Sequence, residues 1–296
     1  MRRFAAWFAV LFAGLFWPVL SSAQGFQITD ERGIASNFAQ PPQRIVSLLP
    51  SLTESVCAMG QCQRLVGVDR YSNFPASVQR LPTVGGGLDP NIEAIVALKP
   101  DVVLLSTSSR AASRLESLGI KVLALEPKTH DDVRRVLSSL GVLLGLADAP
   151  GGEAAALKLW REIDAGVLAA ARSLSPAART TRVYFEVGRG PYAAGESSFI
   201  GQTLSRLGVT NIVPAALGPF PLLNPEFVMR ADPDLIMITG RSPSSLSYPG
   251  WNRIRAIQKQ RICSFNEQEG DVLVRPGPRM AEAARLMVRC LEGKLR

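Results

Sequence analysis

Short apolar runs alternate with segments of helical spacing along most of the chain. Residues 102–105 and 235–238 are apolar at successive positions, which is typical of strands covered on both faces in a parallel sheet. Each half opens with another strand-like segment, at 44–49 and 182–187. Further strand-like segments at 121–125 and 261–265 precede amphipathic helical segments at 131–144 and 278–291. This alternation predicts an α/β fold with a parallel sheet in each half of the chain.

An internal repeat divides the chain into two similar halves. Each copy predicts a short helix, a Pro-Asp break and a buried strand, because proline cannot continue a helix. Four positions match at a constant offset of 133 residues: Asn91 with Asn224, Glu93 with Glu226, Pro100 with Pro233, and Asp101 with Asp234.

A helix-forming segment separates the two halves. Residues 149–175 are rich in Ala, Leu, Lys and Arg, and Leu157, Trp160, Ile163 and Val167 recur at helical spacing. We therefore expect two Rossmann-like lobes joined by a single long α-helix, with a ligand cleft between the lobes. The expected boundaries are an N-terminal lobe at 24–148, a linking helix at 149–175 and a C-terminal lobe at 176–296. A helical joint is stiff, which predicts modest opening and closing.

The N-terminus has the pattern of a secretory signal peptide. Arg2 and Arg3 precede an apolar run, and small residues at Ser21 and Ala23 suit cleavage after residue 23. The alternative is a membrane anchor, but the run is short for a spanning helix and contains glycine and proline. We expect residues 1–23 to be removed and the rest to be exported as a soluble chain.

Charge and cysteine content narrow the class further. The formal net charge is +8, but the basic residues are scattered and form no run that would indicate nucleic-acid binding. Four cysteines in an exported protein favour disulfides, with three possible pairings. We expect Cys57–Cys62, which are close in sequence, and Cys263–Cys290.

The sequence lacks the usual signatures of catalysis. It has no G-x-S-x-G elbow and no phosphate-binding loop. Its one histidine, His130, follows the expected helix cap Thr129, where we predict an exposed side chain. A site built from several histidines is therefore impossible, and neither an enzyme nor a resident metal or cofactor is expected.

Binding candidates lie where predicted strands end. Ser51 and Glu54 fit a capping box that opens a helix after the first strand, at the edge of the sheet where ligands of open α/β folds bind. Tyr71 follows the next strand and offers an apolar face with a hydroxyl, although core packing is an equal alternative.

The second half offers matching candidates. Tyr192 lies on a glycine-rich loop after the first strand of that half, and Phe220 lies on a proline-flanked loop. Arg275, in the segment Arg275-Pro-Gly-Pro-Arg279, is the charged candidate for contacting a ligand.

These segments resemble the helical-backbone class of periplasmic substrate-binding proteins of ABC importers. Within that class the likeness is strongest to vitamin B12-binding proteins. It covers residues 44–292 and rests on 44–54, 66–75, 91–101, 191–195 and 275–279. The repeated Asn-x-Glu and Pro-Asp unit is characteristic of the class and is less diagnostic of the ligand.

The resemblance implies roles for individual residues. Ser51, Tyr71, Tyr192, Phe220 and Arg275 fall on ligand-cleft positions. Glu93 and Glu226 fall on positions that dock onto arginines of a two-subunit inner-membrane permease, which works with its ATPase. The sequence also departs from the family. In typical vitamin B12-binding proteins tryptophans line the cleft, and here the resemblance places Gly87 and Ser106 at those positions.

The function expected from these observations is periplasmic capture of a corrinoid such as vitamin B12 by a monomer that delivers it to an ABC permease. The alternative within the same fold is an iron–siderophore or a haem, with Arg275 pairing with an anionic ligand. Two classes with a different function are further alternatives: a hydrolase-like enzyme, whose nucleophile elbow the sequence lacks, and a structural envelope protein with an empty cleft.

Overall fold

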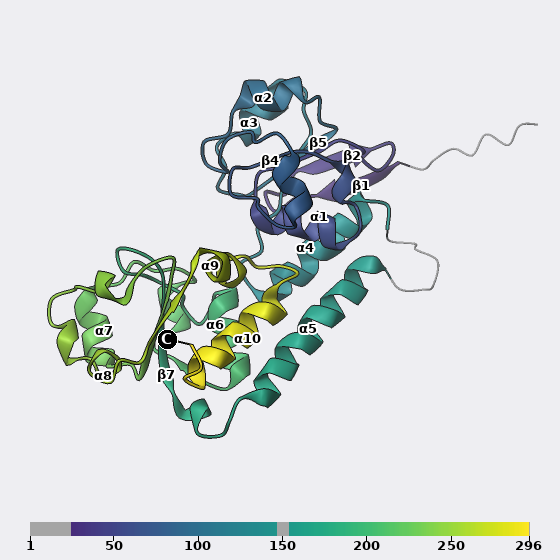
Figure 1. Cartoon of the computed structure of the whole chain (residues 1–296). Helices are drawn as coiled ribbons and strands as arrows, with labels where there is room; N and C mark the ends of the chain where they lie inside the picture. Colours follow the sequence, from purple (N-terminus) through teal and green to yellow (C-terminus); the bar gives the residue numbers. More distant parts are fainter. Residues whose placement is uncertain (1–24, 147–153, 296) are drawn as a thin grey trace, which may run out of the picture.

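Two parallel sheets organise the chain, one in each lobe of the computed structural model, which describes residues 25–146 and 154–295 (Figure 1). Helices cover both sheets, and the long helix α5 (Ala155–Ser173) lies beside both lobes. The predicted fold class is confirmed. The predicted signal peptide and the start of the predicted linking segment lie outside the described residues.

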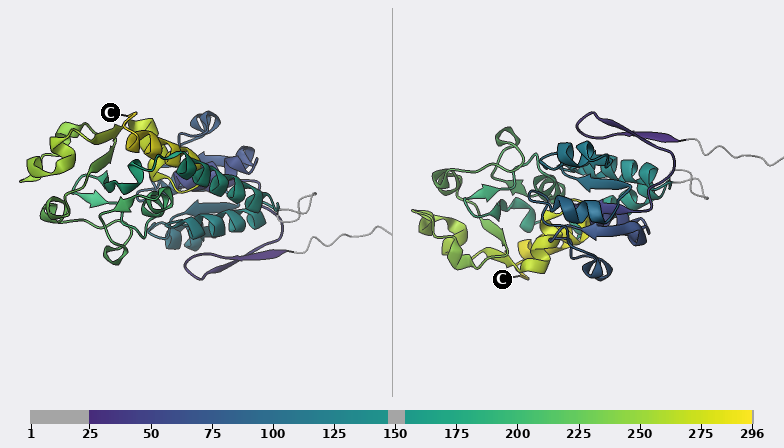
Figure 2. Two further views of the ribbon diagram at one scale, coloured as in Figure 1. Left: turned by 90° about the horizontal axis from the view of Figure 1, so that it is seen from below. Right: turned by 90° about the horizontal axis from the view of Figure 1, so that it is seen from above.

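The N-terminal lobe contains a four-stranded sheet in the order β4-β3-β5-β6, with every neighbouring pair parallel. An antiparallel hairpin, β1 (Phe26–Thr29) and β2 (Ala35–Phe38), lies at the outer edge of this lobe (Figure 2). Asp30 at its turn accepts a hydrogen bond from the backbone of Ala124 (3.1 Å), which fixes the hairpin to the sheet. The strands and helices of the lobe are β3 (Ile45–Ser47), β4 (Leu65–Val68), β5 (Val102–Leu105), β6 (Val122–Ala124), α1 (Pro50–Ala58), α2 (Ile92–Ala97), α3 (Ala112–Ser117) and α4 (His130–Leu143).

The C-terminal lobe repeats this strand order. Its parallel strands run β9-β7-β10-β11, so in both lobes the first parallel strand lies between the second and the third. The short strand β8 adds to β7 in antiparallel direction. The elements are β7 (Arg182–Gly188), β8 (Tyr192–Ala193), β9 (Thr210–Asn211), β10 (Leu235–Thr239), β11 (Ile262–Phe265), α6 (Phe199–Leu207), α7 (Pro225–Ala231), α8 (Arg255–Gln258), α9 (Glu267–Val274) and α10 (Met280–Leu291).

The sequence repeat corresponds to the units α2–β5 and α7–β10. The side chains of Asn91 and Asn224 cap the two helices by accepting hydrogen bonds from backbone N–H groups, each at 2.9 Å. Asp101 accepts from the backbone at the start of β3, and Asp234 accepts from the backbone at the start of β7. Each repeated Asn therefore starts its helix, and each repeated Asp joins the following strand to its neighbour.

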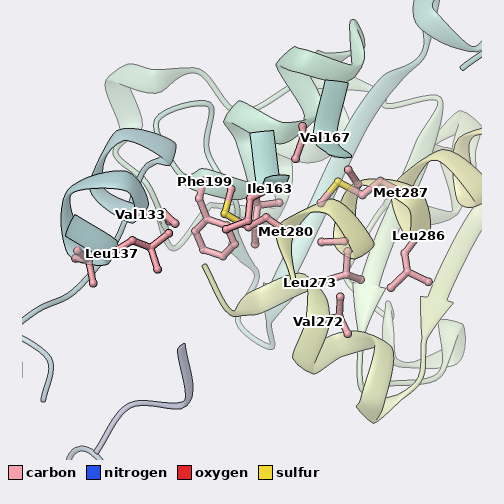
Figure 3. Close-up of a cluster of buried hydrophobic side chains, with 14 of the residues drawn as sticks. Val133, Leu137, Ile163, Val167, Phe199, Val272, Leu273, Met280, Leu286 and Met287 are labelled. Carbon is pink, nitrogen blue, oxygen red and sulfur yellow. The ribbon is translucent and has the colours of Figure 1, made fainter. Parts of the chain in front are cut away.

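One apolar core runs through both lobes (Figure 3). Helix α5 packs on α4 of the N-terminal lobe and on α6 and α10 of the C-terminal lobe. Ile163 and Val167 of α5 are buried in this core together with Val133 of α4 and Met280 of α10. Leu157, predicted to share the apolar stripe, is instead exposed, and the buried face of α5 consists of Ala156, Ile163, Val167, Ala170 and Ala171.

Both predicted disulfides are confirmed. Cys57 at the end of α1 is bonded to Cys62, and Cys263 in β11 is bonded to Cys290 in α10. The second bond joins the edge strand of the C-terminal sheet to the last helix. Within the described residues, no helix combines the length and apolar character that a membrane span requires.

Candidate ligand cleft between the lobes

A cleft of about 480 Å³ lies between the lobes, within the range of about 300–1,000 Å³ usual for small-molecule sites. The N-terminal lobe lines it with the start of α1 and with the loop between β6 and α4. The C-terminal lobe lines it with the start of α6, with the loop at 217–221 and with the residues on either side of Arg275. Its lining includes Leu49, Ser51, Glu126, Lys128, Phe199, Phe220, Val274 and Pro276.

A second hollow of about 370 Å³ extends the cleft into the C-terminal lobe, since Phe220 and Val274 line both. It reaches Val187 and Thr239 near the carboxyl ends of β7 and β10. Ligands of open α/β sheets bind at this end of the strands. We call the two hollows together the inter-lobe cleft.

Paired backbone segments present Phe220 and Tyr192. The backbone N–H of Ala193 donates to the carbonyl of Pro221 (3.0 Å), so the loop with Phe220 lies along β8. The Phe220 ring contacts Phe199 edge-on, with centroids 6.2 Å apart. Both predicted aromatics keep exposed surface, 38% for Phe220 and 44% for Tyr192.

A buried polar cluster supports the loop that precedes Tyr192. The carboxylate of Glu186, which is fully buried, accepts from Arg241 (2.7 Å) and from the hydroxyls of Tyr184 (3.0 Å) and Tyr248 (3.2 Å). The Tyr248 oxygen in turn accepts from the backbone N–H of Gly190 (3.3 Å). Burial raises the pKa of Tyr184, so its hydroxyl stays a proton donor to Glu186.

The predicted residues of the N-terminal lobe lie in different environments. Ser51 is buried and lines the cleft. Gly87 lies beside the end of β3, where a Cβ atom would come within 2.8 Å of the carbonyl oxygen of Leu48. A tryptophan could not replace this glycine without a shift of the backbone. The Tyr71 side chain is 60% exposed, and its backbone belongs to the junction described next.

Arg275 joins the lobes. It is 6% exposed, and its Nη1 donates to Glu54 (2.9 Å) and Asn73 (2.8 Å) of the N-terminal lobe. Its Nη2 donates to the carbonyl of Tyr71 (2.9 Å) and pairs with Asp271 (2.8 Å). Its chain neighbours Val274 and Pro276 line the cleft instead. A direct ligand contact through Arg275 stays a prediction, but in this structure both terminal nitrogens are committed to the lobe junction.

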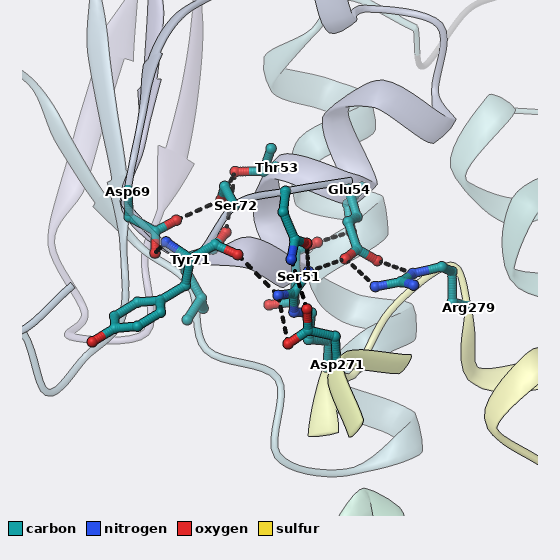
Figure 4. A network of polar contacts seen from close by, with 12 residues as sticks. Ser51, Thr53, Glu54, Asp69, Tyr71, Ser72, Asp271 and Arg279 are labelled. Atoms are coloured by element: carbon teal, nitrogen blue, oxygen red, sulfur yellow. Dashed lines mark hydrogen bonds and ion pairs between the residues drawn. The ribbon is translucent and has the colours of Figure 1, made fainter. Parts of the chain in front are cut away.

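Glu54 is the acceptor at the centre of this junction (Figure 4). Its carboxylate also receives two hydrogen bonds from Arg279, at 2.8 and 2.6 Å. The predicted capping box of Ser51 and Glu54 is therefore wrong: the cap position is Leu49, without a side-chain bond, and the helix begins at Pro50. We call Glu54, Asn73, Asp271, Arg275 and Arg279 the clasp.

A hydrogen-bonded chain behind the clasp fixes the loop that supplies Tyr71 and Asn73. Asp69 is buried and accepts from the backbone of Tyr71 (3.0 Å) and from the hydroxyl of Ser72 (Figure 4). The hydroxyls of Ser72 and Thr53 lie 2.9 Å apart. Burial is the largest influence on Asp69 and raises the pKa of its carboxyl group.

A second junction joins α4 to α6, and we call it the histidine junction. Nε2 of His130 lies 2.9 Å from Oγ1 of Thr203, whose own hydroxyl donates to the carbonyl of Phe199. Nδ1 lies 3.0 Å from Nη1 of Arg206, so it acts as an acceptor and Nε2 carries the proton. The predicted exposure of His130 is wrong, since it is 8% exposed, whereas the predicted cap Thr129 is present.

The histidine junction holds a neutral imidazole. Burial first, and then the neighbouring guanidinium of Arg206, lower the pKa of His130 from 6.5 to about 4. The described residues contain no group of three or more His, Cys, Asp or Glu side chains suited to hold a metal ion.

The two candidate docking residues occupy equivalent places in the repeat. Glu93 lies in the first turn of α2 and Glu226 in the first turn of α7, and both are exposed. Glu226 forms only a loose, exposed ion pair with Arg230 at 3.8 Å.

A family model described as periplasmic binding protein matches residues 45–269. The match spans both sheets and the cleft between them. The chain belongs to the periplasmic binding protein family. Family members of this kind serve ABC importers as substrate-binding proteins, and the predicted class is confirmed.

Relatives of this periplasmic binding protein carry different ligand names. A vitamin B12-binding protein of Pectobacterium atrosepticum is 30% identical over 250 residues, 82% of this chain and 86% of the relative. A periplasmic haem-binding protein of Pseudomonas aeruginosa has a TM-score of 0.69 at 25% identity and covers 86% and 94% of the two chains. The vitamin B12-binding protein of Vibrio cholerae shares the fold, with a TM-score of 0.65 at 24% identity over 85% and 97% of the chains.

Sequence reasoning missed the clasp and the histidine junction of this periplasmic binding protein. Arg275 and Arg279 are spaced by four residues in a basic segment, and Glu54 is the one charged residue of its helix. Those two signals together could have indicated a buried ion pair. Nothing in the sequence indicated that the two segments meet.

Proposed function

We propose that the chain is the periplasmic substrate-binding component of an ABC importer, and that it captures a corrinoid and delivers it to the inner-membrane permease. The observation that carries the proposal is the inter-lobe cleft. Its aromatic side chains, Phe199 and Phe220, lie between the two lobes, and the relative from Pectobacterium atrosepticum, at 30% identity, is a vitamin B12-binding protein. In this proposal the leader is cleaved, the mature protein works as a periplasmic monomer, and it catalyses no reaction.

The chemistry of the cleft suits a large ligand with an apolar face. Phe220, Val274, Pro276 and Leu49 supply apolar surface, and the backbone of Tyr192 pairs with that of Leu222, two residues after Phe220. The one histidine lies in the lobe junction and so is not offered to a metal chelate in the cleft. Ser51, Tyr71, Gly87, Tyr192, Phe220 and Arg275 are the proposed ligand-binding set, with Arg275 acting through the clasp.

Haem or an iron–siderophore is the second candidate. Likeness to the haem-binding protein of Pseudomonas aeruginosa supports it, as do the exposed residues Tyr71 and Tyr192, since a tyrosine can ligate iron. The two candidates differ in colour, charge and metal ligation, so one ligand panel separates them.

The deciding experiment is the melting temperature of the purified protein with cyanocobalamin, cobinamide, haemin or a ferric siderophore. A ligand at 100 times its dissociation constant adds about 2.7 kcal/mol to stability. We expect the corrinoids to raise the melting temperature. In Phe220→Ala the affinity is expected to fall about tenfold or more, because an aromatic wall of the cleft is lost.

Leu157→Ala is the control, since it removes a similarly exposed apolar side chain from α5, outside the cleft lining. It should bind like the wild type. A shift with haemin or a siderophore alone would move the protein to the second candidate. Equal corrinoid affinity in wild type and Phe220→Ala would remove Phe220 from the site.

Delivery is tested separately from binding. Two equivalent exposed carboxylates suit a permease built from two subunits, and such charges mainly steer association. We expect the double variant Glu93→Lys and Glu226→Lys to bind its ligand normally while uptake by cells falls severalfold. The control is Glu162→Lys, an exposed reversal on α5. Normal uptake in the double variant would contradict the docking role.

A further inference from the structure

The charges that line the inter-lobe cleft contrast with those of the whole chain. The chain carries a formal charge of +8. The cleft lining holds three carboxylates, Glu126, Glu267 and Asp271, against the single ammonium group of Lys128, a formal charge of −2. The acidic character is therefore a local property of the cleft.

The basic groups near the cleft are largely neutralised. Nζ of Lys128 lies 3.9 Å from the carboxylate of Glu126. Arg275 is held by Glu54 and Asp271 in the clasp. Arg241, which follows the lining residue Gly240, is paired through Nη2 with the buried carboxylate of Glu186, while its Nη1 is buried and has no hydrogen-bond partner among the described residues. The charged groups that an incoming ligand meets first along these walls are therefore the carboxylates.

The carboxylates also differ in how much hydrogen-bonding capacity remains. Glu126 accepts from the backbone and hydroxyl of Thr107, and Asp271 accepts from Asn73 and pairs with Arg275. Glu267 is exposed in the first turn of α9, and its carboxylate receives no hydrogen bond from the described residues. It is the acceptor that a ligand can use without breaking a contact.

We propose that this acidic lining makes the cleft selective for ligands whose periphery donates hydrogen bonds, such as the primary amides of a corrinoid, and against ligands with peripheral carboxylates. The inference rests on the proposed function and assigns Glu267 as a specificity-determining residue. An amide N–H₂ group of the ligand donates a hydrogen bond to a carboxylate of the protein that the bound ligand shields from water. A ligand carboxylate at the same place leaves two like charges together, which is unfavourable in a site of low dielectric.

The test compares cyanocobalamin with its monocarboxylic derivatives, in which one peripheral amide is hydrolysed, at low ionic strength by titration calorimetry. We expect at least one derivative to bind wild type about tenfold more weakly than the amide form. In Glu267→Gln this ratio should fall severalfold, because the neutral amide side chain no longer repels the acid.

Glu282→Gln is the matched control. Glu282 is likewise an exposed carboxylate in the first turn of a C-terminal-lobe helix, but it lines a different hollow, beyond the clasp. The ratio should stay at the wild-type value in this variant.

The outcomes separate the two proposals. Equal binding of the amide and all acid forms by wild type would overturn the selectivity and leave the corrinoid function intact. Tight binding of haemin, which carries two propionates, with no corrinoid binding would overturn both. An equal change of the ratio in Glu267→Gln and Glu282→Gln would show a general charge effect and would remove Glu267 from the assigned role.

Discussion

The clasp and the histidine junction join the same pair of lobes by opposite means. In the clasp, the first helix of the N-terminal lobe meets residues that flank the last helix of the C-terminal lobe. In the histidine junction, the first helix of the C-terminal lobe meets the start of α4, the last helix of the N-terminal lobe. The clasp uses buried full charges, whereas the other junction uses a neutral imidazole.

This difference teaches that a pseudo-symmetric architecture does not require equivalent chemistry at its contacts. The clasp depends on the presence of both partners, because a buried charge without its partner is costly. The histidine junction depends on protonation state, because its imidazole has no room for a second proton next to Arg206. Removal of a charged partner should therefore weaken the clasp, whereas acidification should weaken the histidine junction.

The largest expected effect comes from breaking the clasp. Glu54→Gln removes the charge that the buried Arg275 and the partly buried Arg279 share, and we expect a loss of about 3–5 kcal/mol in the free energy of unfolding, measured by urea denaturation. Glu226→Gln is the control and should change stability little, because its exposed ion pair contributes little. Similar midpoints for both variants would mean that the clasp is not a stabilising joint.

Acidification should weaken the histidine junction next. The folded-state pKa of His130 is lowered from 6.5 to about 4, so the unfolded chain takes up a proton first as the pH falls. Stability from this residue is complete above pH 6.5 and is lost as the pH falls toward 4, by about 3 kcal/mol.

Two measurements isolate that effect. Because the chain has one histidine, its imidazole resonance gives the titration directly, with an expected midpoint near 4. The difference in stability between wild type and His130→Gln, followed from pH 7 to pH 4.5, removes the contribution of the carboxylates. A midpoint at the ordinary value of 6.5 would show that the imidazole is not buried as described.

The smallest expected effect sharpens the cause of the lowered pKa. Arg206→Gln removes the second influence on His130 and leaves its burial, so the titration midpoint should rise without reaching 6.5. Arg135→Gln is the control on α4, where Arg135 pairs with Glu31 and Asp132. If both variants titrate like wild type, burial alone sets the pKa.

The sequence predicted the features that depend on local patterns. The Asn, Pro and Asp positions of the repeat have a local function in capping helices and joining strands, so they located both sheets correctly. Cys57 and Cys62 were close enough in sequence for their pairing to be expected, and the second disulfide then followed.

The features that sequence reasoning missed depend on contacts between distant segments. Glu54 and Arg275 are separated by 221 positions, and His130 and Arg206 by 76. The sequence of α1 alone favoured a helix-capping role for Glu54, but in the structure its carboxylate forms ion pairs with Arg275 and Arg279. For His130, the local cap at Thr129 was correct, while burial by α6 decided its exposure and its pKa.

The apolar core shared by α4, α5, α6 and α10 has a consequence for how the molecule folds. Each lobe has a smaller cluster of its own, but neither encloses all of its hydrophobic surface, because Val133 on one side and Met280 on the other complete the same cluster around Ile163. A chain with this arrangement should lose its structure in one cooperative transition. A chimera that takes one lobe from a relative would then fold only if the helices of the new lobe pack against those of the other lobe in this shared core.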